Sequence, residues 1–156
     1  MTKWAGRWLR VPVVPVVSIV LAVLVTGCAR EDAASYNIDG DQNLGISLLR
    51  ETYPWRDGWD MKLVTTHVPE CLRRHALKPA PLKPFIVELF QPEKQVFILR
   101  QGSNWYVTEL GQCRLQPFDT PPPAPGLRLG AFVEKNGALV FVDEAGKAGS
   151  SIRINR

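Results

Sequence analysis

The chain has 156 residues, of which 46% are apolar, 22% are charged and 9% are aromatic. This length allows one domain with a short appendage and excludes a large multidomain enzyme. The composition also excludes a disordered acidic or basic tail. The formal net charge is +4, but Lys3, Arg7 and Arg10 precede every acidic residue, and the remainder carries a net charge of +1. We therefore expect no nucleic-acid partner.

The first 25 residues have the pattern of a secretory signal. Residues 1–10 are basic, and residues 11–25 are apolar except for Ser18. As a helix, the second segment would rise about 22 Å, which is less than the roughly 30 Å of bilayer hydrocarbon. A permanent membrane span is therefore the less favoured alternative, and we expect residues 1–27 to be removed as a signal peptide.

The end of this segment, Val25–Cys28, has the sequence VTGC, in which an aliphatic residue and two small residues precede a cysteine. It resembles the lipobox of bacterial lipoproteins. The resemblance implies that the chain is cut before Cys28, and that acyl chains such as palmitate on Cys28 anchor the protein to a membrane. Because Ala29 rather than an acidic residue follows, it further implies the periplasmic face of the outer membrane rather than the inner membrane. A plain secretory signal with an incidental Cys28 is the alternative.

The mature chain begins with polar residues. Residues 28–43 are polar and small without a periodic apolar pattern, which is typical of a flexible tether, here a lipidated one. Residues 44–52 place three leucines on one helical face and are followed by Pro54, which predicts a short helix.

A β-rich domain is predicted over residues 44–116. The pattern of residues 61–67 predicts a strand, and Pro69 then opens a predicted helical turn over residues 71–77. Three β-branched and aromatic runs, separated by turn residues, predict an antiparallel meander: 85–90, 94–100 and 104–110.

The C-terminal part begins with a proline-rich connector over residues 117–126. Within residues 127–156, Asn136-Gly137 predicts a β-hairpin, and a last short strand is expected at 151–155. About thirty residues cannot bury a core alone, so we expect the hairpin to pack on the domain or form a small lobe beside it. The predicted fold class is therefore mainly β (α+β): a small antiparallel meander, one or two short helices, a C-terminal hairpin and one disulfide.

The disulfide is predicted between Cys71 and Cys113, the only cysteines left beside Cys28, because disulfides persist in exported proteins. His67, Cys71 and His75 would share one face of a continuous helix, and imidazole with thiolate suits Zn²⁺. Pro69 interrupts such a helix and a disulfide would consume the thiolate, so we expect neither a metal site nor another cofactor there.

The segment Tyr53–Trp59 is the candidate binding surface. Tyr53, Trp55 and Trp59 lie within seven residues that also hold a proline and a glycine. Aromatic side chains on a rigid loop are used to recognise sugars and proteins. The alternative is that the tryptophans belong to the core. We expect Trp59, which leads directly into a strand, to be the more buried and Trp55, within the turn, to be exposed.

The sequence contains no recognisable nucleophile elbow, phosphate loop, zinc-protease motif or dinucleotide fingerprint, and we assign no catalytic residue. The favoured function is a lipid-anchored, non-catalytic binding or accessory module that engages an envelope protein, peptidoglycan or lipid. A small inhibitor of a hydrolase is the second hypothesis, and an enzyme with an unfamiliar motif is the third.

Overall fold

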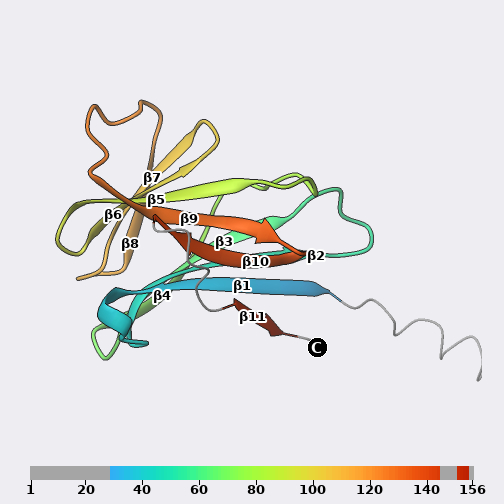
Figure 1. Ribbon diagram of the computed structural model, residues 1–156, viewed down its shortest axis with the longest axis horizontal. Coiled ribbons are helices and arrows are strands. Elements are labelled where there is room, and N and C mark those ends of the chain that lie inside the picture. Colours follow the sequence, from blue (N-terminus) through green and yellow to red (C-terminus); the bar gives the residue numbers. More distant parts are fainter. Residues whose placement is uncertain (1–28, 145–150, 155–156) are drawn as a thin grey trace, which may run out of the picture.

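The structure is a computed structural model that describes residues 29–144 and the backbone of residues 151–154. The predicted signal peptide and Cys28 lie outside the described residues. The fold is mainly β, as predicted, and consists of two antiparallel sheets (Figure 1). In spatial order the first sheet holds β11 (Ser151–Ile154), β1 (Arg30–Asn37), β2 (Leu44–Thr52), β3 (Asp60–His67) and β4 (Cys71–Ala76). The second holds β10 (Ala138–Asp143), β9 (Leu127–Lys135), β5 (Ile86–Glu93), β6 (Val96–Gln101), β7 (Asn104–Glu109) and β8 (Arg114–Phe118).

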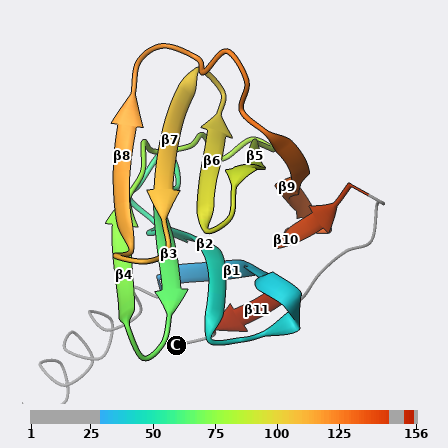
Figure 2. The ribbon, with the colours of Figure 1, turned by 90° about the vertical axis from the view of Figure 1, so that its left-hand side faces the viewer.

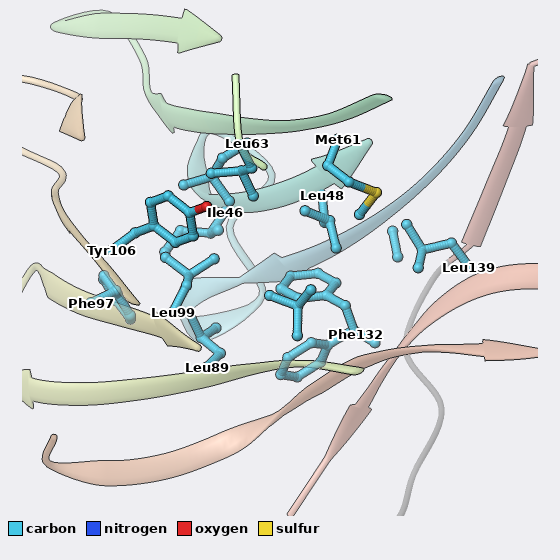
Figure 3. Packing of buried hydrophobic residues seen from close by; sticks show 14 of the residues in the cluster. Ile46, Leu48, Met61, Leu63, Leu89, Phe97, Leu99, Tyr106, Phe132 and Leu139 are labelled. Atoms are coloured by element: carbon cyan, nitrogen blue, oxygen red, sulfur yellow. The ribbon is translucent and has the colours of Figure 1, made fainter. Parts of the chain in front are cut away.

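The hydrophobic core lies between the two sheets. Alternate residues along each strand point inward, so that Ile46 and Leu48 of β2 share the interior with Leu89 of β5 and Leu99 of β6 (Figure 3). All four side chains are fully buried. Burial of one aliphatic side chain of this size contributes about 1.5–3 kcal/mol, so this layer holds the two sheets together.

The predicted tether is wrong, because residues 30–37 form β1, an inner strand of the first sheet. β1 pairs with β2 on one side and with β11 on the other. Its inward residues include Asp32 and Ala34, which are both buried. A small and a charged side chain at core positions hide the apolar alternation that normally indicates a strand. The sandwich therefore begins at residue 30, and the expected domain boundary at residue 43 is wrong.

The predicted helix over residues 44–52 is also wrong, because this segment is β2. It pairs with β1 and β3 along its whole length. Gly45 fits this position, since a Cβ there would lie 2.5 Å from the carbonyl oxygen of Tyr36. Leucines at helical spacing are also compatible with a strand when both faces of the sheet are partly covered. Here the pairing of residues 44–52 with β1 and β3 favours the strand over the helix.

The predicted helical turn over residues 71–77 is wrong in the same way. Residues 71–76 form β4, which pairs with β3 and is the outer strand of the first sheet. In the described residues the helical element is the 3-10 turn Ile38–Gly40, which joins β1 to β2. No helix of the described residues is long and apolar enough to cross a membrane.

The meander and the C-terminal hairpin are confirmed. β5, β6 and β7 pair consecutively, and β8 follows as a fourth strand. β9 and β10 form the hairpin at Asn136-Gly137, and β9 pairs with β5, so the hairpin belongs to the second sheet. The proline-rich segment ends β8, with Pro117 on the outer strand where a missing N–H is tolerated, and then connects β8 to β9.

Candidate functional site

The predicted disulfide joins Cys71 to Cys113, with 6.0 Å between their Cα atoms. It links the first residue of β4 to the residue before β8, and these two strands follow the same side of the molecule (Figure 2). The bridge therefore ties the outer strand of one sheet to the outer strand of the other.

Both histidines lie beside this disulfide. The Nδ1 atom of His67 is 3.1 Å from the carbonyl oxygen of Leu110, and the Nε2 atom of His75 is 2.8 Å from that of Cys113. Each ring therefore makes a hydrogen bond to backbone, and the Cys71 sulfur is in the disulfide. In the described part of the chain, no group of three or more His, Cys, Asp or Glu side chains is placed to hold a metal ion.

The predicted aromatic surface is split by the structure into an outer and an inner part. Tyr53 and Trp55 stack on each other with ring centroids 5.2 Å apart, and Trp55 is 71% exposed. Trp59 is only 3% exposed and points into the protein. The expectation that Trp55 is the exposed tryptophan and Trp59 the buried one is therefore confirmed, and Trp59 cannot belong to an outer binding surface.

The outer pair is held by Glu51 at the end of β2. The Tyr53 hydroxyl donates a hydrogen bond to Glu51, and the Lys62 ammonium donates another. The hydrogen bond from Lys62, followed by that from Tyr53, lowers the pKa of Glu51, and the same bond to Glu51 is the main cause that raises the pKa of Tyr53. These hydrogen bonds hold the Tyr53 ring in place, and Tyr53 in turn supports the exposed ring of Trp55 in the β2–β3 loop.

The inner tryptophan packs against a buried arginine that the sequence analysis missed. Arg50 is fully buried, and its guanidinium carbon lies 4.3 Å from the centroid of the Trp59 ring. The guanidinium of Arg30 lies 5.4 Å from the same ring. Cation–π contacts of this kind are strongest when the cation is shielded from water, as Arg50 is.

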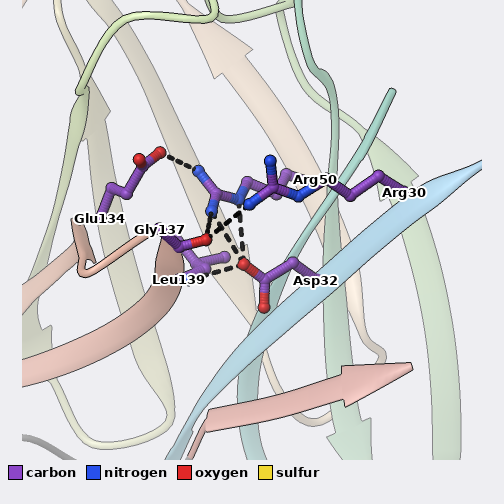
Figure 4. Close-up of polar contacts among 6 residues, drawn as sticks. All are labelled: Arg30, Asp32, Arg50, Glu134, Gly137 and Leu139. Carbon is purple, nitrogen blue, oxygen red and sulfur yellow. Dashed lines mark hydrogen bonds and ion pairs between the residues drawn. The ribbon is translucent and has the colours of Figure 1, made fainter. Parts of the chain in front are cut away.

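Arg50 connects the two sheets through charged and backbone partners (Figure 4). It donates to Asp32 Oδ2 through Nη2 at 2.8 Å, to Glu134 of β9 through Nη1, and to the carbonyl oxygen of Gly137 at 3.1 Å. The same Asp32 oxygen accepts the backbone N–H of Leu139 in β10 at 2.7 Å. We call Asp32, Arg50 and Glu134 the buried ion network, and its contacts give it a structural role.

A signal for this network exists in the sequence. In a strand, Arg50 shares a face with Ile46 and Leu48, so a strand over residues 44–52 requires a buried arginine. A buried charge needs partners, and Asp32 faces Arg50 directly in the register of β1 and β2. Because residues 44–52 were predicted to form a helix, neither the burial of Arg50 nor its pairing with Asp32 was predicted.

A cleft of about 610 Å³ lies on the outer face of the second sheet and was also not predicted. The connector between β4 and β5, the β6–β7 turn and β9 contribute to its wall. The lining residues are Pro79, Ala80, Pro81, Pro84, Phe85, Ile86, Glu88, Arg100, Gln101, Gly102, Ser103, Asn104 and Arg128. Prolines fix much of one wall, and a pocket with apolar walls and few polar groups is the usual form of a binding site.

Charged side chains form one part of the cleft lining. Glu88 accepts from Arg100 at 2.5 Å and from Arg128 at 3.3 Å. Glu88 is mostly buried, whereas the two arginines are 46% and 40% exposed. Gln101 fixes the connector, because its side-chain amide donates to the carbonyl oxygen of Lys78 at 2.8 Å. Arg128 also pairs with Glu144. The cleft therefore holds partly exposed guanidinium groups, already paired with carboxylates of the protein, beside an apolar wall.

No family model matches this chain, and comparison with curated proteins and with solved structures found no significant match. Function is therefore inferred from the residues themselves.

Proposed function

We propose that this protein is a lipid-anchored component of a bacterial cell envelope whose domain faces the periplasm and binds an envelope partner without catalysis. The observation that carries the anchor is the order of a basic start, an apolar segment and the lipobox-like sequence Val25–Cys28. The folded domain starts two residues after Cys28, so a chain cleaved before Cys28 would keep all of β1. The periplasmic face of the outer membrane is the proposed address.

The anchor is tested by replacing Cys28 with serine. The variant should remain a full-length precursor and take up no fatty-acid label, because the thiol that accepts the lipid is gone. The parent protein should be labelled and shorter by the signal peptide. Electrophoresis of cells grown with a labelled fatty acid measures both effects. Equal labelling of the variant would contradict the assignment of Cys28.

The proposed binding site is the cleft on the outer face of the second sheet. Its exposed Ile86 and its arginines suit a partner that combines apolar groups with carboxylates, such as a segment of an envelope protein or the stem peptide of peptidoglycan. The non-catalytic assignment has two supports. The buried ion network is engaged in holding strands together, and neither histidine is among the residues that line the cleft.

A photocrosslinking residue at position 86 tests this site in intact cells. Ile86 is 59% exposed, and Leu72 of β4, which is 63% exposed on the other sheet, is the matched control position. We expect a discrete adduct from position 86 and none from position 72. Arg100→Glu should reduce the adduct, since it reverses a charge in the cleft. Identical adducts from both positions would contradict a specific site.

The hydrolase-inhibitor hypothesis requires an exposed loop that carries an ionic side chain. The β2–β3 loop satisfies this requirement, since Trp55 and Arg56 are both exposed. This loop follows Thr52, which pairs with Arg30 only two residues after Cys28, so a lipid anchor would place it beside the membrane. An incoming enzyme would find it obstructed there, and we therefore favour the binding module.

A further inference from the structure

We propose that one end of the sandwich docks into the headgroup layer of the membrane, with Trp55 at the membrane interface. This inference rests on the proposed lipidation of Cys28. We call this end, formed by the start of β1, the β2–β3 loop and the β9–β10 turn, the anchor end. All three lie at the same end of the molecule in Figure 1.

The contacts of Arg30 define the anchor end. Arg30 is paired with Thr52, the last residue of β2, and its guanidinium donates to the carbonyl oxygen of Gly137 at 2.8 Å. Arg30 is two positions after Cys28 in the sequence, and an extended chain of that length spans only about 7 Å. A lipid on Cys28 would therefore hold the β2–β3 loop and the hairpin turn against the headgroups, with no tether between domain and membrane.

The anchor end exposes side chains that suit the interface between hydrocarbon and water. Trp55, 71% exposed, is the most exposed of the large apolar side chains of the described residues, and Tyr53 stacks against it. Leu82 is 50% exposed and lies two residues beyond Ala80, which bridges to Trp59. Tryptophan and tyrosine favour the level of the headgroups because an apolar ring and a polar edge are combined in one side chain.

Charge distinguishes the anchor end from the opposite end. Three exposed cations lie on or beside the anchor end: Arg30, Lys83 and Lys135. Arg56 adds a fourth, partly compensated by Asp60 at 3.6 Å, and Asp57 is the exposed acid of the same loop. The turns at the opposite end instead expose Asp39, Asp41, Glu70 and Glu93, with Lys94 as an exposed cation, and Arg73 and Arg74 are exposed on the adjoining strand β4. Anionic headgroups therefore attract the anchor end.

The arrangement can be tested with single cysteine variants of the full acylated protein in vesicles. Cys28 is lipidated and Cys71 is bonded to Cys113, so an introduced cysteine is the one free thiol. An environment-sensitive fluorophore is attached at Trp55→Cys or at Leu127→Cys. Leu127 is the matched control, since it is 69% exposed and lies eight residues before Lys135 on β9, about 27 Å from the hairpin turn.

We expect the probe at position 55 to shift to the blue and to be quenched by brominated lipids in vesicles that contain phosphatidylglycerol. The probe at position 127 should show neither effect. Quenching at position 55 should weaken in vesicles of phosphatidylcholine alone and at high salt, because the electrostatic part is then lost. These results would place the β2–β3 loop in the interface.

Two outcomes would overturn the inference. In the first, the probe at position 55 stays in water on protein-free vesicles. In the second, it becomes shielded only in native membranes that contain other proteins, so that the loop binds a protein instead. Both are distinguishable from failure of the proposed anchor, because in that case the parent protein carries no fatty-acid label and does not sediment with vesicles at all.

Discussion

Trp59→Ala is expected to lower the free energy of unfolding by about 3–5 kcal/mol, as do other truncations of fully buried aromatic side chains. The ring is 3% exposed and covers the guanidinium of Arg50. Its removal leaves a cavity at the point where the buried ion network joins the two sheets. Urea denaturation followed by circular dichroism measures the loss.

Two control variants separate burial from aromatic chemistry. Trp55→Ala should change the free energy of unfolding by less than about 1 kcal/mol, because Trp55 is 71% exposed. Trp59→Phe should recover most of the stability, since the Trp59 Nε1–H has no hydrogen-bond partner among the described residues and its loss breaks no bond. Equal costs for Trp55→Ala and Trp59→Ala would contradict the division of this segment into an outer and an inner part.

The elements predicted correctly are those whose local patterns agree with their surroundings. The meander β5–β6–β7 and the hairpin at Asn136-Gly137 combine strand-forming residues with turn residues of the required type. The disulfide was predictable because the expected export favours disulfides and the two cysteines left beside Cys28 allow one pairing. These features depend on short-range sequence or on simple counting.

The elements predicted wrongly are those that depend on long-range pairing. β1 contains Ala33, Ala34 and Ser35, which are too small to mark a buried strand, and its place is determined by β2 and β11 on either side. β4 carries mostly exposed residues, as an outer strand does, and has no alternation to detect. In both cases the neighbouring strands supply the information that the local sequence lacks.

The candidate site was predictable only in part, for the same reason. The exposure of Trp55 and the burial of Trp59 follow from their positions in a turn and before a strand. The cleft joins side chains from β5, β6 and β9 with prolines of the connector between β4 and β5, and no local pattern brings these segments together. The membrane-facing role proposed for Trp55 depends on β1, because β1 brings Cys28 close to the β2–β3 loop, whereas a flexible tether would not.

Arg50→Met is expected to lower the free energy of unfolding by about 3–5 kcal/mol, the usual cost of removing one partner from a buried ion pair. The change preserves much of the side-chain volume, so packing contributes little. It leaves the carboxylate of Asp32, which is 2% exposed, without its cation, and it also removes the partner of Glu134. Equilibrium urea unfolding at neutral pH measures the difference.

A second variant shows whether the uncompensated charge is the cause. In Arg50→Met combined with Asp32→Asn, the amide oxygen still accepts the backbone N–H of Leu139, but no charge is buried at position 32. This double variant should be more stable than Arg50→Met alone, because an uncompensated buried carboxylate costs more than a hydrogen-bonded amide. If the second substitution instead adds a further loss, the strain of a misplaced methionine side chain at position 50, rather than buried charge, accounts for the effect of the first.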